Sequence, residues 1–160
     1  MIFVTVGTHP DQFDRLIRKI DTIAPKIKEK IVIQRGFTKY QPKNCEYFDF
    51  CPNLDEYFKK ARLVISHSAT SILESSIKYK KPLITVPRQA KYREHINDHQ
   101  VEFAVYFARK TGIMAILNVK EITPYLLKNY KKIPKIDPSE LGRLQDYFKS
   151  LFEKILRELK

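Results

Sequence analysis

The chain has 160 residues, of which 43% are hydrophobic and 30% are charged, so it is long enough for one domain with a single buried core. This composition excludes a disordered chain, and no apolar run reaches the roughly 18 residues needed to span a bilayer. The formal net charge of +12 favours anionic partners, such as a nucleic acid, an acidic membrane surface or a phosphorylated substrate.

Both the N-terminal residues and the cysteines indicate a cytoplasmic protein. The segment MIFVTVGTHP lacks the basic start and the long apolar stretch of a signal peptide. Cys45 and Cys51 are too few for a disulfide framework, and their spacing relative to the four histidines matches no metal-binding pattern. We therefore expect two ordinary thiols and no bound metal.

Short β-branched runs alternate with amphipathic segments along most of the chain. Strands are predicted at 2–6, 31–34, 46–50, 63–66, 83–86 and 113–117. Helices are predicted from Asp11 to Pro25, after the N-cap residue Asn53, and at 70–79, 96–110 and 121–128. This alternation predicts an α/β three-layer sandwich with a mostly parallel sheet. Neither GxGxxG nor GxxxxGK[ST] occurs, so no dinucleotide fingerprint or P-loop is expected.

The last part of the sequence predicts one further amphipathic helix. Pro134 and Pro138 interrupt the chain, and the DPSE segment is a typical helix start. We therefore divide the sequence into a domain at 1–133 and a C-terminal helix at 134–160. That helix would dock a partner or pack on the domain's own sheet through an apolar side formed by Leu144, Phe148, Leu151, Phe152 and Ile155.

Two polar segments follow neighbouring strands between Arg62 and Gln100. In an open parallel sheet, ligands bind at the carboxyl ends of the strands, where both segments would lie. The turn at 66–71 opens a helix with free backbone N–H groups and hydroxyls, which suit an anion. Glu74 lies one turn further, where a carboxylate can hold sugar hydroxyls. These features predict a nucleotide site.

Four sequence pieces occur in the order and spacing of a known family: FVTVGT, LVISHSATSILE, KPLITVPR and EHINDHQVEFA. Over residues 1–117 the chain resembles the C-terminal, nucleotide-sugar-binding half of GT-B glycosyltransferases, family 28. It is similar in particular to small members that form half of a two-subunit enzyme. These include the catalytic subunit that adds the second GlcNAc to dolichol-linked oligosaccharide, and subunits of exopolysaccharide synthesis. The resemblance implies a Rossmann-like fold.

The resemblance also implies positions that bind the diphosphate and the ribose of a UDP-sugar. Glu74 matches the carboxylate that binds ribose hydroxyls. Arg88 is near enough in sequence to help neutralise the diphosphate, and Lys91 or Arg93 are alternatives. The positions that match the phosphate-binding turns are Gly7, Thr8, Ser68, Ala69 and Thr70.

Further matching positions border the base and the donor sugar. Arg35-Gly36 matches a loop that borders the donor, and Phe50-Cys51 matches the uracil-recognition segment. Each of these positions has an alternative, purely structural interpretation: Arg35 as a surface charge, Phe50-Cys51 as the end of a core strand, and His99 as a structural histidine. The segment that matches the sugar-binding loop consists of Asn97, Asp98, His99 and Gln100.

The sequence departs from the family in the turn after the fourth strand. Many relatives have His-x-Gly-x-Gly there, whereas this chain has HSATS. Serine and alanine can present the same N–H groups to a phosphate only if φ stays negative. A non-catalytic regulatory or scaffolding subunit with a degraded site is therefore an alternative function.

The resemblance implies an inverting transfer without a metal or another cofactor, since no Asp-x-Asp motif occurs. The UDP-sugar would be a substrate. His9 follows the first strand and is a candidate general base, with a surface-loop histidine as the alternative.

A chain with only the donor half implies a partner. We expect a membrane-anchored subunit that binds a lipid-linked saccharide acceptor and holds this protein at the cytoplasmic face of the membrane. An epimerase would need both halves of the fold, and no nucleic-acid-binding motif occurs, so neither is favoured.

Overall fold

The architecture is seen in a computed structural model, which describes residues 1–136 together with residues 143, 146 and 150. The predicted apolar side of the C-terminal helix lies outside the described residues. None of the described helices has the length and apolar character that a membrane crossing requires.

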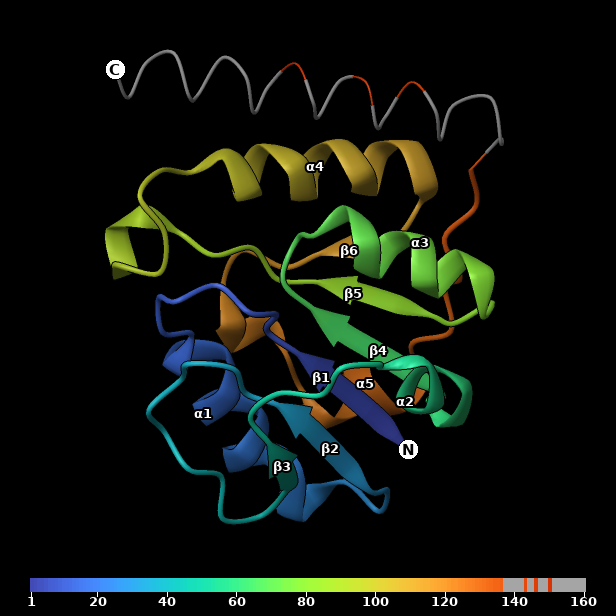
Figure 1. Ribbon diagram of the computed structural model, residues 1–160. Coiled ribbons are helices and arrows are strands. Elements are labelled where there is room, and N and C mark those ends of the chain that lie inside the picture. Colours follow the sequence, from blue (N-terminus) through green and yellow to red (C-terminus); the bar gives the residue numbers. More distant parts are fainter. Residues whose placement is uncertain (137–142, 144–145, 147–149, 151–160) are drawn as a thin grey trace.

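A single six-stranded parallel sheet forms the centre of the described chain (Figure 1). The strand order is β3-β2-β1-β4-β5-β6, so the direction of strand addition reverses between β1 and β4. Ligands bind at such reversal points, outside the carboxyl ends of the strands. The strands are β1 (Ile2–Thr5), β2 (Ile31–Gln34), β3 (Glu46–Phe48), β4 (Leu63–Ser66), β5 (Leu83–Thr85) and β6 (Met114–Ala115).

Helices cover both faces of the sheet and create two hydrophobic cores. Ile2 and Val4 of β1 face one core, and Phe3 faces the other, because side chains alternate along a strand. The first core includes α1 (Asp14–Ile23) and α5 (Pro124–Asn129). The second includes α2 (Asp55–Lys60), α3 (Thr70–Lys78) and α4 (His99–Thr111). This arrangement confirms the predicted three-layer, Rossmann-like fold.

Short 3₁₀ helices complete the connections between the main elements. They are η1 (Ala24–Lys26), η2 (Ala90–Tyr92) and η3 (Val119–Glu121). The first follows α1 on the way to β2, and the other two follow the carboxyl ends of β5 and β6.

Several predicted element ends were wrong. Asp11 does not cap α1; the Thr38 hydroxyl accepts the Phe13 N–H at 3.1 Å, and the Gln12 side chain accepts the Asp14 N–H at 2.7 Å. The last predicted helix of the domain starts later than expected, because Thr123 caps it and Pro124 begins it. A distant residue, Thr38, contributes to the first of these ends, whereas the neighbouring residues Thr123 and Pro124 set the second.

The turns after β1 and β2 pack against each other through two glycines. Gly7 has φ +72° and Gly36 has φ +55°, both in the left-handed region. A Cβ on Gly36 would lie 2.5 Å from the Gly7 carbonyl oxygen. Only glycine permits both this backbone conformation and this close approach.

Gly36→Ala is expected to lower the free energy of unfolding by about 2–4 kcal/mol, because it adds a backbone clash to a strained φ. Gly112→Ala is the matched control. It also has positive φ, but its Cβ would meet only the flexible end of Lys132, at 3.0 Å. A loss of about 1 kcal/mol is expected there. Urea unfolding followed by circular dichroism measures both, and equal losses would contradict the close approach.

Candidate functional site

The carboxyl ends of β1 and β4 meet in a contact between a glycine and a histidine. A Cβ on Gly7 would lie 2.5 Å from Cε1 of His67. Two hydrogen bonds inside the sheet fix the turn at Gly7. The Thr5 hydroxyl bonds to the Gln34 side chain, and Nε2 of Gln34 donates to the Gly7 carbonyl at 3.2 Å. The chain therefore approaches the strand-reversal point with backbone rather than side chains, while the neighbouring Thr8 is exposed.

Histidines gather around this turn. The rings of His9 and His95 have centroids 4.6 Å apart, and those of His95 and His99 are 4.4 Å apart. His67 interacts electrostatically with both His9 and His95. These four residues are all the histidines of the sequence. Sequence reasoning had not assigned a role to His67 or His95, although both lie in the polar segments that follow β4 and β5.

Burial keeps these histidines neutral at pH 7. Loss of solvation, followed by the charge of Arg88, lowers the pKa of His67 to about 4. Burial, with a smaller effect from the neighbouring imidazoles, lowers the pKa of His95 to about 4. Burial also lowers the pKa values of His9 and His99. Neutral imidazoles can donate one hydrogen bond each to an anion without carrying charge.

Arg88 connects the site to three other segments. Its guanidinium donates to the carbonyl oxygens of Val6 at 2.9 Å, Asp11 at 2.9 Å, Gln12 at 3.0 Å and Glu94 at 3.3 Å. The side chain is 1% exposed, and burial lowers its pKa to about 10, so it stays charged at pH 7. This geometry supports a structural role for Arg88, in addition to any effect of its charge on a bound diphosphate.

The loop between β5 and α4 is also fixed by an ion pair between Arg15 and Glu94. Arg15 of α1 donates two hydrogen bonds of 2.9 Å to the fully buried Glu94. Gln89 donates to the Leu117 carbonyl at 2.6 Å, which ties the same loop to the end of β6. A pair made by two parallel hydrogen bonds is directional, so the loop carrying His95 has a defined position.

The predicted sugar-binding segment lies at the start of α4. The Asn97 side chain bonds to Nδ1 of His99, and the Asp98 carboxylate accepts the Ala90 N–H at 2.8 Å. The Gln100 side chain accepts the Arg88 N–H at 3.1 Å and is 7% exposed. The structure thus brings this segment beside the histidines, with Gln100 orienting the loop from within.

The start of α3 presents backbone rather than hydroxyl groups to the edge. The Ser68 hydroxyl bonds to the Thr85 hydroxyl at 2.8 Å and is buried. No side chain caps the helix, whose N-cap residue Ala69 has φ −110°. Thr70 is the first helical residue, and Glu74 lies one turn on, partly buried. The turn keeps negative φ without glycine, which leaves N–H groups at the helix start for an anion.

Beyond β2 and β3 the edge is aromatic. The exposed rings of Phe37 and Phe50 are in edge-to-face contact, with centroids 4.9 Å apart. Arg35 pairs with Asp49 at 2.5 Å and lies over the Tyr47 ring, so its charge is held within this corner. The Cys51 thiol bonds to the Asn53 carbonyl at 3.1 Å.

Two hollows of the described chain lie mainly over other parts of the fold, although Cys51 also lines one of them. One of about 560 Å³ lies over β2, β3 and α2, and one of about 350 Å³ lies between η1 and α5. Within the described residues no group of three or more His, Cys, Asp or Glu side chains is placed to hold a metal ion.

The fold and this edge define the Rossmann-like C-terminal half of a GT-B fold. Glycosyltransferase family 28 C-terminal domain is the family whose model matches residues 1–143. The chain therefore belongs to this family. No protein with a curated description matches it by sequence.

Three solved structures share this fold with the chain. The glycotransferase of kitacinnamycin is 16% identical with a TM-score of 0.56, and the match covers 91% of this chain and 37% of that one. SnogD from Streptomyces nogalater is 12% identical with a TM-score of 0.56, and the match covers 81% of this chain and 34% of SnogD. MurG from Acinetobacter baumannii is 14% identical with a TM-score of 0.52, and the match covers 78% of this chain and 38% of MurG. At these identities the likeness shows the fold alone. The matched region spans little more than a third of each relative.

The histidine pKa values predict acid sensitivity. Between pH 6.5 and pH 4 the unfolded chain binds more protons than the folded chain, so the free energy of unfolding should fall as pH falls. The slope is at most about 1.4 kcal/mol per pH unit for each shifted histidine. His95→Asn should flatten this slope, whereas Lys91→Gln on the same loop should not. Urea unfolding at several pH values tests this, and an unchanged slope in His95→Asn would refute it.

Proposed function

We propose that the protein is the donor-binding subunit of a UDP-sugar-dependent, inverting glycosyltransferase. It would transfer a hexose or an N-acetylhexosamine to a lipid-linked saccharide acceptor. The observation that carries this proposal is the family match over residues 1–143. It is supported by the structure, because the polar segments that resemble the family's donor-binding segments lie at one edge of the sheet. Two of the three related structures are themselves named as a glycotransferase and a glycosyltransferase.

In this proposal the diphosphate binds between the ends of β1 and β4. Backbone N–H groups at Gly7 and at the start of α3 would contact its oxygens, since no side chain occupies the helix start. His67 would donate from its neutral ring. Glu74 would bind the ribose hydroxyls, and the Phe37–Phe50 corner would contact the uracil, because an exposed aromatic pair suits a planar base.

The donor sugar would lie against the loop that begins α4. Asn97 and His99 hold each other in a fixed geometry, which suits recognition of hydroxyl groups. Attack by the acceptor hydroxyl at C1 would release UDP, whose growing negative charge the N–H groups and neutral imidazoles can stabilise. This scheme requires no metal ion.

A second polypeptide would supply the general base. His9 accepts the Asp11 N–H at Nδ1 at 3.2 Å, so the neutral ring carries its proton on Nε2. In that tautomer Nε2 donates and cannot take the acceptor proton. We infer that His9 assists as a hydrogen-bond donor, and that a membrane-anchored partner brings both the base and the lipid-linked acceptor.

A non-catalytic regulatory subunit is the second candidate, favoured by the HSATS turn that lacks the family's glycines. The negative φ values of that turn support retained phosphate binding instead. Nucleotide binding distinguishes the two functions, because a degraded site would show no preference for uridine.

Glu74→Gln should weaken UDP binding by about tenfold or more, because a carboxylate bonded to ribose hydroxyls contributes about 1.5–3 kcal/mol. The wild-type chain should prefer UDP to 2′-deoxy-UDP, and this preference should shrink in the variant. Glu121→Gln, an exposed carboxylate on η3, is the control. Isothermal titration calorimetry measures the affinity of each of the three proteins for each of the two nucleotides. Absence of uridine-specific binding by the wild-type chain would support the regulatory function.

Deletion of residues 139–160 should abolish co-purification with a membrane-anchored Rossmann-like partner while the domain stays folded. Co-expression of each chain with a candidate partner, followed by a UDP-sugar transfer assay, measures association and activity together. A shortened chain that still co-purifies would disprove docking through this segment. Equal activity of the isolated full chain would disprove dependence on a partner.

A further inference from the structure

The net charge of the chain is concentrated at the amino edge of the sheet, opposite the donor site. Helices run back against the parallel strands, so helix ends and strand starts share this edge (Figure 1). Fifteen of the 30 lysines and arginines lie there but only one of the 18 acids, Glu29, so these ranges carry a charge of +14 and the rest of the chain carries −2. We call this the basic edge, formed by residues 26–30, 59–62, 78–81, 109–110 and 128–135.

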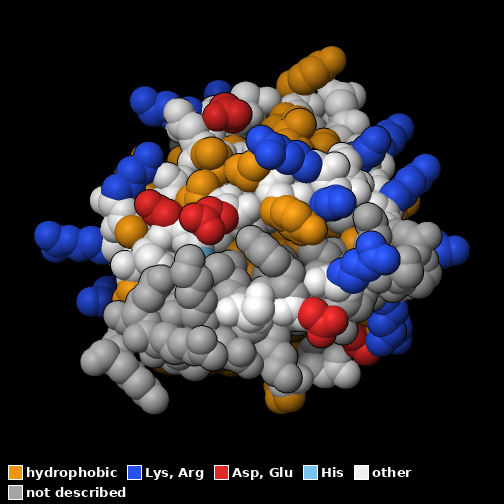
Figure 2. Space-filling model, turned by 90° about the horizontal axis from the view of Figure 1, so that it is seen from above, with side chains coloured by type: hydrophobic (Ala, Val, Ile, Leu, Met, Phe, Trp, Pro, Cys, Tyr) orange, Lys and Arg blue, Asp and Glu red, His pale blue; other side chains and the backbone are white. Residues whose placement is uncertain are grey.

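Figure 2 shows lysine and arginine side chains around the outline of one face of the molecule, on both sides. Cations therefore occur at both ends, and the scarcity of acids distinguishes the basic edge. Glu29, the one acid in these ranges, pairs with the N-terminal amine and Arg62, each at 2.7 Å, and the neighbouring Glu46 of β3 pairs with Lys30 at 2.7 Å. The one acid is thus already engaged. Lys30, Lys59, Lys60 and Lys78 have carboxylate partners, whereas Lys26, Lys28 and Lys128 have none within the described residues.

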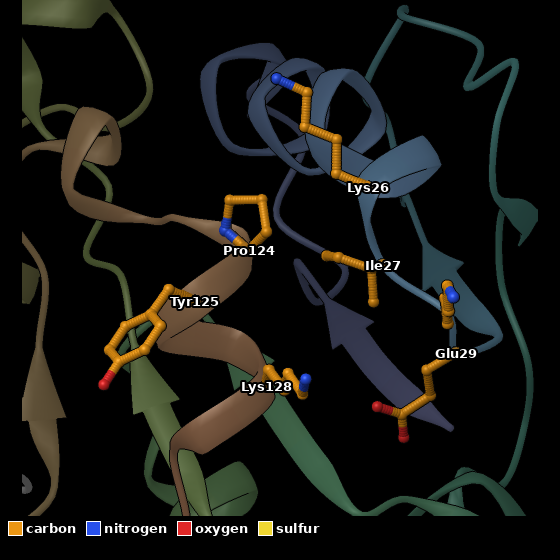
Figure 3. A pocket seen from close by; sticks show the side chains of 7 residues that line it. Lys26, Ile27, Glu29, Pro124, Tyr125 and Lys128 are labelled. Carbon is orange, nitrogen blue, oxygen red and sulfur yellow. The ribbon is translucent and has the colours of Figure 1, made fainter.

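A hollow of about 350 Å³ lies within this edge, between η1 and α5 (Figure 3). Lys26 and Lys28 come from one wall and Lys128 from the other, and all three are exposed. Within residues 1–136, no carboxylate pairs with any of them. Ile27 lines the hollow, and Tyr125 stands at its rim with 79% of its surface exposed.

This combination fits an anionic lipid surface better than the alternatives. A lysine in the last turn of a helix interacts favourably with the helix dipole, which explains Lys78 of α3 and Lys110 of α4. It does not explain the lysines that lie in the connections between helices and strands. Thirteen of the fifteen cations are lysines, whereas nucleic-acid readout favours the planar fork of arginine. An exposed tyrosine among lysines is typical of a contact at the headgroup level of a bilayer.

We propose that the basic edge binds directly to anionic membranes, with Tyr125 at the headgroup level and Lys26, Lys28 and Lys128 on lipid phosphates. This contact requires neither the partner subunit nor the donor. It would leave the carboxyl edge open to nucleotide sugars in solution. β1 spans four residues, about 13 Å, so the site would stay near the lipid surface.

Vesicle flotation of the full chain tests the proposal. The chain should float with vesicles of phosphatidylcholine and phosphatidylglycerol at 7:3, but not with phosphatidylcholine alone, and 0.5 M salt should release it. Each lysine near such a surface contributes roughly fivefold in affinity. Lys26→Gln/Lys28→Gln/Lys128→Gln should therefore lose tenfold or more. Lys39→Gln/Lys91→Gln/Lys120→Gln, with the same net charge, should lose less than threefold.

A fluorescence measurement locates the contact, because the chain has no tryptophan. The single indole of Tyr125→Trp should shift to the blue on vesicle binding and be quenched by brominated lipid. The indole of Phe37→Trp, at the opposite edge, should show neither effect. Equal losses in the two triple variants, no binding to anionic vesicles, or tighter binding to duplex DNA than to vesicles at the same salt would each overturn the proposal.

Discussion

The site depends on the buried guanidinium of Arg88. It donates to carbonyl oxygens at the end of β1, in the segment before α1 and in the loop before α4, three stretches that are distant in the sequence. Without it, four carbonyl oxygens near the sheet edge would lack their donor, and an unsatisfied buried polar group costs about 1–3 kcal/mol. The positions of His9 and His95 follow from this bridge, because each lies on a loop that Arg88 holds.

The two ends of the sheet have opposite properties. The carboxyl edge is built from backbone N–H groups, neutral imidazoles and an aromatic pair, and its charged groups Arg35, Arg88 and Glu94 are already engaged. Hydrogen-bond donors at such an edge can stabilise the negative charge that grows on a leaving diphosphate, without having to rearrange. The amino edge instead carries exposed lysines, among them Lys26, Lys28 and Lys128, whose charge can attract a diffuse anionic surface. Donor recognition and membrane association are therefore separable by mutation.

The sequence was sufficient for the sheet but not for the site's interior. Hydrophobic runs such as IVIQ and LVIS predicted β2 and β4 correctly, because a strand buried on both faces has an apolar signature. The helix start at Asp14 was missed, because its N–H group is accepted by the Gln12 side chain in a non-standard turn. The clustering of His67 with His95 was also missed, because it depends on how two loops cross in space. The bond from Gln100 to the Arg88 N–H could not be predicted for the same reason.

The central position of β1 has a consequence for synthesis on the ribosome. β1 pairs with β2 on one side, and on the other side Ile2 lies opposite Leu63. β1 therefore leaves the ribosome some sixty residues before β4, and its second edge stays uncovered during that interval. During that interval an apolar strand with unpaired backbone groups is open to wrong pairing. Until β4 is made, β1 is therefore a segment that a chaperone for nascent chains can bind.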